Sequence, residues 1–287
     1  MQLINYELPG DDCNIFLFGD VHTGGLMSYE EGFNEMVDMM HSPYDGLAAK
    51  YNVGLDHGDQ IEAIEVRDKR FCLETTKIAS IDKQIQYAID MRLPIKKKLI
   101  CALKGNHEQT IIRFTNATER ICLGVGIRYG TFSAAITYID KKGRLMFKHY
   151  ATHGKGKISS RAHTPQMRLA NMRNQIQQKL MNKFGDTLLN TRGDAHKLIF
   201  LKPESQLYLT TQANKIRQNY TEPRKRSGYI EPHHKWYANT GSFLKQYVVG
   251  VDSYSERADY DPVELGFIIC KVRNRTVADL VKVPLLV

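Results

Sequence analysis

The stretch Leu103-Lys104-Gly105-Asn106-His107-Glu108 follows a basic and apolar run, residues 96–103, that predicts a short buried strand. A glycine, an amide, an imidazole and a carboxylate come in immediate succession, as expected where a strand ends in a sharp loop that presents polar side chains in a cleft. Gly105 would permit that turn, because glycine reaches positive φ without steric cost. A string this short can arise by chance, so its meaning depends on other metal-binding residues at strand ends.

Two further strands and two helices precede this stretch in the prediction. Apolar runs at residues 14–18 and 51–56 indicate short buried strands, and mixed polar and apolar periodicity indicates helices at 28–40 and 80–92. The second helix stops before Pro94, as a helix between two parallel strands would. The chain therefore opens with the rhythm strand, helix, strand, helix, strand, which is typical of α/β proteins.

Polar residues follow each of these strands. Asp20 and His22 come after the first strand and, two positions apart, point to the same side of an extended chain. Asp59 follows the second strand, and Asn106 and His107 follow the third. A carboxylate and an imidazole together make a plausible half-site for a divalent transition metal. Because α/β architectures place ligands at the C-terminal ends of strands, these groups are expected to meet in one site.

The second half of the chain is richer in predicted strands. His153-Gly154 follows a strand expected at 144–152, and Gly193-Asp194-x-His196 precedes an apolar run at 197–201. Further strands are expected at 206–211, 266–272 and 276–283, a basic glutamine-rich helix at 166–184, and polar loops at 214–228, which carries Arg224, Lys225 and Arg226, and at 252–262.

Composition and charge restrict the class of protein. The 287 residues are 42% hydrophobic and 25% charged, as in a globular protein that is expected to be cytoplasmic, with no membrane helix and no signal peptide. Five cysteines without a CxxC pair predict reduced thiols. The net charge is +9, and residues 141–185 contain no Asp or Glu. That basic segment favours a polyanionic partner such as nucleic acid or a nucleotide, although a merely solvated basic face stays open.

Taken together, the polar groups form an ordered series. In chain order they are Asp20-x-His22, Gly58-Asp59, Gly105-Asn106-His107-Glu108, His153-Gly154 and Gly193-Asp194-x-His196. The series resembles the calcineurin-like metallophosphoesterase superfamily, whose pattern is DxH, GDxx(D/E), GNH(D/E), a lone His before Gly, and GHxH. The resemblance runs from Asp20 to Ser242, where 239–242 looks like the NPGS that follows the last motif. More weakly, residues 254–266 resemble small phosphoesterases encoded by bacteriophages.

The resemblance implies an α/β fold, a four-layer α-β-β-α sandwich. Two mixed β-sheets would lie face to face with helices outside, and the metal ligands would lie in loops at one edge. The chain 1–287 would form a single domain, with a basic loop-helix insertion at about 155–192. If a bacteriophage encodes the chain, its location would be the host cytoplasm.

The resemblance also implies two divalent metal ions, manganese first and iron, zinc or nickel as alternatives. Asp59 would bridge the two ions. Asp20, His22, Asp59 and His196 would hold the first, and Asp59, Asn106, His153 and Asp194 the second. Asp194 replaces the first histidine of GHxH, so a second interpretation stays open in which Asp194 only orients the site and a water takes the ligand position.

The implied catalytic residues are His107, Glu62 and Glu108. His107 would touch neither metal and would donate a proton to the leaving oxygen. Glu62, three residues after Asp59, matches the acidic residue of that motif and could hold the His107 ring, with Glu108 as the competing candidate.

The expected activity is hydrolysis of a phosphodiester bond in a nucleic acid or nucleotide, by in-line attack of a metal-bridging hydroxide. Lys155, Lys157 and Arg161 would bind the substrate, because they follow the His153 ligand and can neutralise phosphate charge. Two alternatives stay open, a phosphomonoesterase acting on small molecules or proteins and an inactive fold used as a binding module. No Asp-Arg-Gly follows Glu62, which disfavours a protein phosphatase. The exact substrate and the oligomeric state are left open.

Overall fold

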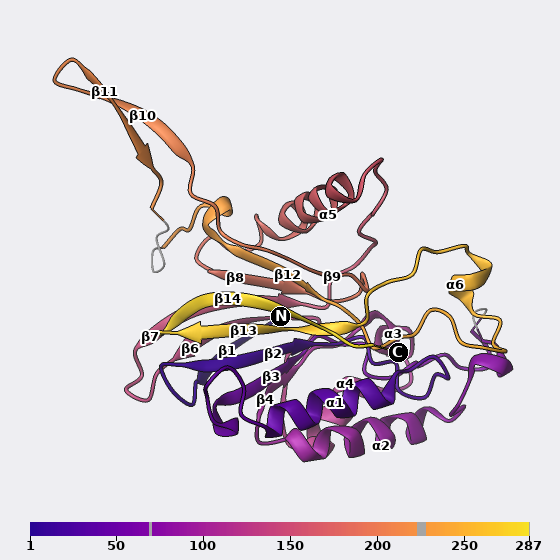
Figure 1. Cartoon of the computed structure of the whole chain (residues 1–287). Helices are drawn as coiled ribbons and strands as arrows, with labels where there is room; N and C mark the ends of the chain where they lie inside the picture. The colour runs from indigo at the N-terminus through magenta and orange to yellow at the C-terminus, as the bar shows by residue number, and fades with distance from the viewer. Residues whose placement is uncertain (69–70, 223–227, 287) are drawn as a thin grey trace.

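The computed structural model describes residues 1–68, 71–222 and 228–286. Two six-stranded β-sheets pack face to face, and helices cover the outer side of each (Figure 1). This is the α/β four-layer α-β-β-α sandwich expected from the sequence, so the predicted fold class is confirmed.

The first sheet carries the opening strand–helix rhythm. Its strand order is β14 (Thr276–Pro284), β13 (Gly266–Arg273), β2 (Cys13–Phe18), β3 (Asn52–Asp56), β4 (Leu99–Ala102) and β5 (Arg128–Tyr129). Strands β2 to β5 are parallel, and β13 is antiparallel to both of its neighbours. The helices between the parallel strands are α1 (Glu30–His41), α2 (Ile81–Arg92), α3 (Asn106–Thr110) and α4 (Ala117–Val125).

The second sheet is also mixed. Its strand order is β1 (Gln2–Glu7), β6 (Ser133–Ile139), β7 (Leu145–Thr152), β8 (Leu189–Arg192), β12 (Trp236–Thr240) and β9 (Leu198–Leu201). Strands β7, β8 and β12 are parallel to one another, so the segments after β7 and β8 emerge at the same edge. Four short 3-10 turns lie outside the sheets, at η1 (Ala49–Tyr51), η2 (Leu73–Thr75), η3 (Leu93–Ile95) and η4 (Pro232–His234).

Three apolar clusters hold the layers together. One fills the space between the sheets, where Ile15 and Leu55 of the first sheet meet Ile136 and Ala238 of the second. Another lies under α1, α2 and α4, and a third joins α5 (Pro165–Leu180) to the outer face of the second sheet. All six residues of β2 are buried because both of its faces are covered, which explains its continuous apolar sequence.

The predicted polar loop at 214–228 is wrong in part. Strands β10 (Leu207–Gln212) and β11 (Lys215–Tyr220) form a separate two-stranded hairpin that projects from the body (Figure 1). Ala213 and Asn214 connect them with φ values of 48° and 60°, as a type I′ turn requires. The sequence of β11 predicted a loop because its residues are polar, and they are polar because the side chains of this strand face solvent. Residues 223–227 of that prediction, which include Arg224, Lys225 and Arg226, lie outside the described residues.

The basic segment expected to form an insertion at about 155–192 contains α5 and, at its end, β8. Because β8 pairs with both β7 and β12, residues 189–192 are part of the second sheet. The division of the chain into one domain with this insertion stays a prediction. The predicted loop at 252–262 contains one short helix, α6 (Tyr254–Arg257).

Two composition-based expectations can be compared with the structure. None of the helices in the described ranges combines the length and the apolar character needed to cross a bilayer. The five cysteines are unpaired, and all except Cys72 are buried, in agreement with the predicted reduced thiols.

Candidate metal centre

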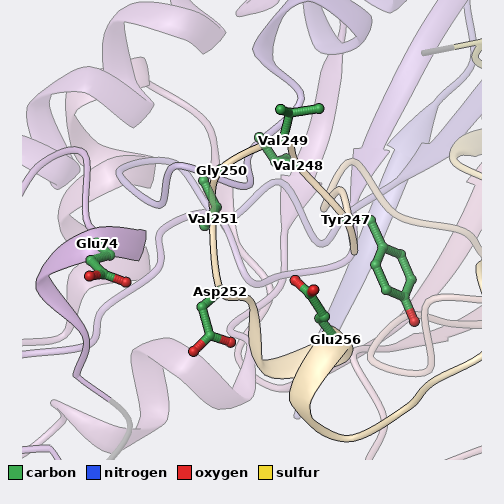
Figure 2. Close-up of a pocket in the computed structure, with 8 residues that line it drawn as sticks. All are labelled: Glu74, Tyr247, Val248, Val249, Gly250, Val251, Asp252 and Glu256. Atoms are coloured by element: carbon green, nitrogen blue, oxygen red, sulfur yellow. The ribbon is translucent and has the colours of Figure 1, made fainter.

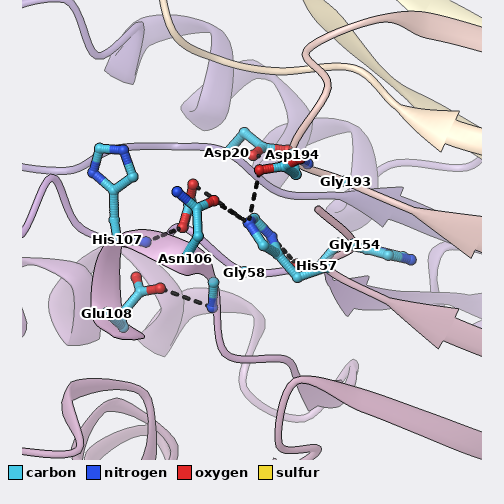
Figure 3. A network of polar contacts seen from close by, with 12 residues as sticks. Asp20, His57, Gly58, Asn106, His107, Glu108, Gly154, Gly193 and Asp194 are labelled. Carbon is cyan, nitrogen blue, oxygen red and sulfur yellow. Dashed lines mark hydrogen bonds and ion pairs between the residues drawn. The ribbon is translucent and has the colours of Figure 1, made fainter. Parts of the chain in front are cut away.

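The predicted ligands lie at the edge where the carboxyl ends of five strands meet. The loop after each strand supplies one or two of them. Asp20 and His22 follow β2, Asp59 follows β3, Asn106 follows β4, His153 follows β7, and Asp194 and His196 follow β8. The structure therefore brings all seven side chains into one region, drawn in part in Figure 3.

The backbone at these positions is strained. The φ angle is positive at Asp20 (55°), His22 (54°), Asp59 (52°), Asp194 (64°) and His196 (49°). A residue other than glycine in a sparsely populated region costs about 1–3 kcal/mol and persists where the surroundings enforce it. Five such residues lie at neighbouring strand ends. The fold therefore holds these side chains in place even though the backbone there is strained.

One group of ligands surrounds Asp20. His196 Nε2 lies 3.4 Å from Asp20 Oδ1, and the rings of His22 and His196 are 5.4 Å apart. Potential ligand atoms of these three residues all lie within 4.8 Å of one another. His22 Nε2 also lies 3.7 Å from Asp59 Oδ2, which connects this group to the next.

The other group surrounds His153. Its Nε2 atom lies 3.5 Å from Asp59 Oδ2, 3.9 Å from Asp194 Oδ1 and 2.7 Å from the amide of Asn106. Asp59 Oδ2 thus faces an imidazole of each group, which is the position of a bridging carboxylate. The buried histidine and aspartate clusters are consistent with a binuclear metal site.

One unsatisfied polar atom shows that the donor set fits a cation. His22 Nε2 is buried without a hydrogen-bond partner. The side-chain amide of Asn106 lies against His153 Nε2, 2.7 Å from its oxygen, and beside Asp59 and Asp194. Leaving a buried polar atom such as His22 Nε2 unpaired costs about 1–3 kcal/mol, and a metal ion bound there would satisfy it.

The histidine rings are already turned as metal ligands are. Glu62 Oε2 lies 3.0 Å from His22 Nδ1, and the main-chain oxygen of His57 lies 2.8 Å from His153 Nδ1. A partner on Nδ1 fixes the tautomer and leaves Nε2 as the ligand atom. Both imidazoles therefore turn Nε2 towards the centre of the site.

Electrostatics couple the protons of the site to metal binding. Burial opposes the charged form of His153, but the Asp59 carboxylate outweighs it and raises the pKa of His153 to about 10. Burial likewise opposes the charge on Asp59, whose pKa is nevertheless held well below its usual value by His153 and His107. A metal ion must displace the His153 proton, so its affinity should fall as the pH falls.

Gly105 is required for space rather than for an unusual backbone angle. Its φ is −90°, not the positive value expected from the sequence. A Cβ atom at this position would lie 2.0 Å from Asp59 Oδ1 and 2.2 Å from Asp59 N. The absence of a side chain lets the loop that carries Asn106 approach the proposed bridging residue.

His107 lies beside the ligands. Its main-chain N–H donates to Asp59 Oδ1 at 2.9 Å, and its ring is 4.5 Å from that of His22. The ring Nδ1 contacts the main-chain oxygen of Glu62. Ligand-competent atoms of His22, Asp59 and His107 also lie within 4.8 Å of one another, so His107 is closer to the ligand set than the sequence suggested. Its role as proton donor stays a prediction.

The two carboxylates proposed to orient His107 have other contacts in the structure. The Glu62 carboxylate lies against His22, as described above. Glu108 is fully buried, and its two oxygens accept from the main-chain N–H groups of Ile61 (3.0 Å) and Gly105 (2.9 Å). Glu108 therefore ties the loop after β3 to the start of α3. Burial raises the pKa of its carboxyl to about 7.

The three predicted substrate-binding residues lie on the exposed segment after His153. Lys155, Lys157 and Arg161 all have exposed side chains. Lys157 donates to the hydroxyl of Tyr260 and lies over its ring, with Nζ 4.5 Å from the centroid. This contact links the basic segment to the loop that follows α6.

Two buried arginines that the motifs did not single out support the site. Arg192 donates to Asp194 Oδ2 at 3.2 Å, and Arg92 donates to Asp56 Oδ2 at 2.8 Å. Asp56 Oδ1 also accepts from the N–H of Gly58, in the loop that leads to Asp59. In the sequence, the position of Arg192 directly before Gly193-Asp194 was the one signal that could have indicated a role in the site.

A separate open pocket of about 640 Å³ lies between η2 and the segment before α6 (Figure 2). Acidic side chains of Glu74, Asp252 and Glu256 contribute to its lining, together with residues 247–251. In the described part of the chain, its lining includes none of the candidate ligands, so it is distinct from the metal centre.

Comparison with known proteins gives distant likenesses only. No protein-family model matches the sequence, and a search of curated proteins finds no match. Among solved structures, the chain is similar to the calcineurin-like phosphoesterase YfkN from Bacillus subtilis, with 12% identity and a TM-score of 0.40 over 95% of this chain and 90% of that one. It is also similar to a Saccharomyces cerevisiae protein serine/threonine phosphatase that resembles human phosphatase PP5, with 12% identity and a TM-score of 0.26 over 71% of this chain and 56% of that one. At these scores the likenesses carry no argument about activity.

Proposed function

We propose that the chain is a calcineurin-like metallophosphoesterase that uses two divalent metal ions to cleave a phosphodiester bond in a nucleic acid or nucleotide. The observation that carries the proposal is the convergence of imidazole and carboxylate groups on both sides of Asp59, with His22 Nε2 buried and without a hydrogen-bond partner. Such a donor set suits divalent transition metals, and manganese is the first metal to test.

The residues divide between the two ions as the motifs imply. Asp20, His22, Asp59 and His196 would hold one ion, and Asp59, Asn106, His153 and Asp194 the other. Paired metals about 3.5–4 Å apart supply an activated water and a clamp for the phosphoryl oxygens. Arg192 would keep Asp194 oriented and offset part of the negative charge of the ligands.

His107 is the residue proposed to move a proton. Its Nδ1 atom faces the main-chain oxygen of Glu62, so an Nδ1–H group donates there and fixes the ring. A doubly protonated ring would then carry its second proton on Nε2, the atom proposed to donate to the leaving oxygen of the substrate. The main chain of Glu62 thus orients the proposed acid while its carboxylate orients His22.

Charge supports a polyanionic substrate. The segment 141–185 has no acidic residue, and Lys155 and Arg161 are exposed on the part that directly follows His153. We propose that these two side chains and Lys157 contact phosphates adjoining the cleaved bond.

A hydrolysis screen with manganese tests the proposal. It compares a bis-aryl phosphodiester, an aryl phosphomonoester, 2′,3′- and 3′,5′-cyclic nucleotides, and single- and double-stranded DNA. We expect the diesters to be cleaved faster than the monoester, and Asp59→Asn to lose both metal and activity. Hydrolysis of the monoester alone would favour a phosphomonoesterase, and metal binding without any turnover would favour a binding module.

A further inference from the structure

Four polar groups form a continuous hydrogen-bonded chain in the otherwise apolar space between the sheets. Tyr138 OH lies 3.2 Å from His149 Nδ1, His149 Nε2 lies 2.7 Å from Thr191 Oγ1, and Thr191 Oγ1 lies 2.6 Å from His57 Nε2. His57 Nδ1 ends the chain on the main-chain oxygen of Phe18 at 3.2 Å. The side chains of all four groups are fully buried, with 0% exposure. We call them the inter-sheet relay.

The direction of every hydrogen bond in the relay follows from its last acceptor. A carbonyl oxygen only accepts, so His57 Nδ1 carries a proton and its Nε2 accepts from the Thr191 hydroxyl. That hydroxyl has one proton to give, so it must accept from His149 Nε2–H. His149 Nδ1 then accepts from Tyr138. Each imidazole then has one defined tautomer, with the proton on Nδ1 in His57 and on Nε2 in His149.

The relay joins three strand ends that deliver metal ligands. His57 comes two residues before Asp59, in the loop after β3 of the first sheet. Thr191 lies on β8 and His149 on β7 of the second sheet, before Asp194 and His153. The bond from Thr191 to His57 therefore crosses from one sheet to the other. The His57 main chain makes a second crossing, because its oxygen accepts from His153 Nδ1.

We propose that the relay is a positioning device, in which His57, Thr191 and His149 fix the loop of Asp59 against the strands of Asp194 and His153. The inference rests on the proposed metal site. Apolar contacts between two sheets are not directional, whereas a hydrogen bond holds its donor and acceptor at a fixed distance and angle. A two-metal site needs its ligands held to about 0.5 Å, and its ligands here come from both sheets.

If the relay only stabilised the fold, these polar side chains would not be required. Removing both partners of a buried hydrogen bond in favour of apolar groups of the same shape is often nearly neutral for the free energy of unfolding. Val, Leu and Phe side chains could fill the same space as the rest of the inter-sheet core does. What such residues cannot supply is a defined distance between the two halves of the site.

Thr191→Val is the direct test, because it keeps the shape and removes two hydrogen bonds. We expect the variant to fold and to bind at least one of two manganese ions about 10–100-fold more weakly, the range seen when groups behind metal ligands are removed. The magnetic coupling between the two ions, read by electron paramagnetic resonance, should weaken or disappear. Thr191→Ser keeps the hydroxyl and should restore both properties.

Thr187→Val is the matched control. Thr187 is also buried, precedes the same strand and donates to Asn190 at 2.8 Å, but is not part of the relay. It should bind both ions as the wild type does, whatever its thermal midpoint. If Thr191→Val misfolds, Tyr138→Phe replaces it, since it removes only the far end of the relay and should weaken binding several-fold.

Nitrogen-15 spectra of the metal-free wild type test the relay without any metal. They should show His57 protonated at Nδ1 and His149 at Nε2, and the opposite tautomer at either ring would overturn the relay. If the wild type binds two coupled ions and Thr191→Val binds them equally well, the positioning role is wrong and the proposed function stands. If the wild type binds no pair of ions, the proposed function itself is wrong.

Discussion

At the scale of single residues, the proposed function separates side chains that would hold a metal from one that would move a proton. His107 is beside the ligands, but its ring has a partner of its own in the main chain of Glu62. Asp59 lies between an imidazole of each ligand group. Substitutions at these two positions should therefore have different consequences.

His107→Asn should retain both metals and lose most of its turnover. General acid catalysis is worth about 10²–10⁴-fold, so we expect a loss of that size in kcat. Elemental analysis of the purified variant and steady-state kinetics measure the two quantities. A variant that keeps wild-type kcat would exclude the proton-donor role, and one that loses a metal would show that His107 is itself a ligand.

Gly105→Ala should damage the site through a steric clash with Asp59. The added Cβ would lie 2.0 Å from Asp59 Oδ1, so either the carboxylate or the loop has to move. We expect weaker metal binding, measured by calorimetry, together with a lower thermal midpoint. Gly228→Ala is the control, because no atom of the described residues lies within 4 Å of its Cβ position. Equal metal affinity in the two variants would contradict the close approach.

The metal-free protein should lose stability as the pH rises above neutrality. His153 has an ordinary pKa of 6.5 and a folded-state pKa of about 10, so its contribution is fully present below 6.5 and is lost as the pH rises through 10. Thermal midpoints measured with a chelator between pH 6.5 and 10 should fall more steeply for the wild type than for His153→Gln. Parallel curves for the two proteins would show that His153 is not the source of the pH dependence.

At the scale of elements, the segment after β7 carries its charge close to the site and is connected to the loop beyond α6. Lys157 contacts Tyr260, which limits the freedom of the basic segment. Lys155 is exposed on the same segment, between His153 and that contact. A phosphate backbone that reaches the metals would pass these side chains.

The double variant Lys155→Ala, Lys157→Ala should bind single-stranded DNA more weakly and with a shallower dependence on salt. Each phosphate contact contributes about 0.7 to the slope of log K against log salt concentration for single strands. The control removes the same charge from Lys141 and Lys142, two exposed lysines of the acid-free segment in the turn between β6 and β7. Equal loss in both variants would show that only net charge matters.

The elements that could be predicted from the sequence are those with a regular apolar pattern. Strand β4 is an apolar run, β2 is apolar except for Asn14, and β3 has an apolar centre, while α1 and α2 have helical periodicity. By contrast, β8 buries Asn190, Thr191 and Arg192, polar residues that no periodicity rule assigns to a core. The prediction missed the exposed, polar strand β11 for the opposite reason, since that strand has no buried face and therefore no apolar pattern.

At the scale of the whole molecule, the convergence of the candidate ligands could be predicted because each one belongs to a short motif directly after a strand. The contacts that orient them could not. Thr191 is adjacent to His57 only because two sheets pack together, and the residues are 134 positions apart. Glu62 likewise reaches His22 across 40 positions. Sequence patterns of one segment contain no signal for such pairs.

Removal of the hairpin β10–β11 should leave the body of the protein intact. Its two ends are adjacent, because Gln206 and Thr221 are joined by a 2.9 Å hydrogen bond from the Thr221 N–H to the Gln206 oxygen. Replacing residues 207–220 by a two-glycine link should change the free energy of unfolding by no more than about 0.5 kcal/mol, as for surface changes. Manganese content should also stay unchanged. A large fall in either would show that the hairpin supports the core.

The exposure of that hairpin also determines which parts of the chain unfold locally and which unfold only with the whole protein. Leu209 and Ile216 are 62% and 73% exposed, and an isolated two-stranded hairpin is marginal in water. Its amide protons should therefore exchange with solvent through local fraying. The amide protons of the fully buried β2 should exchange only through global unfolding. Proteases should cut the hairpin first and release a trimmed but still folded body, which makes its turn at Ala213-Asn214 a suitable place to insert a tag.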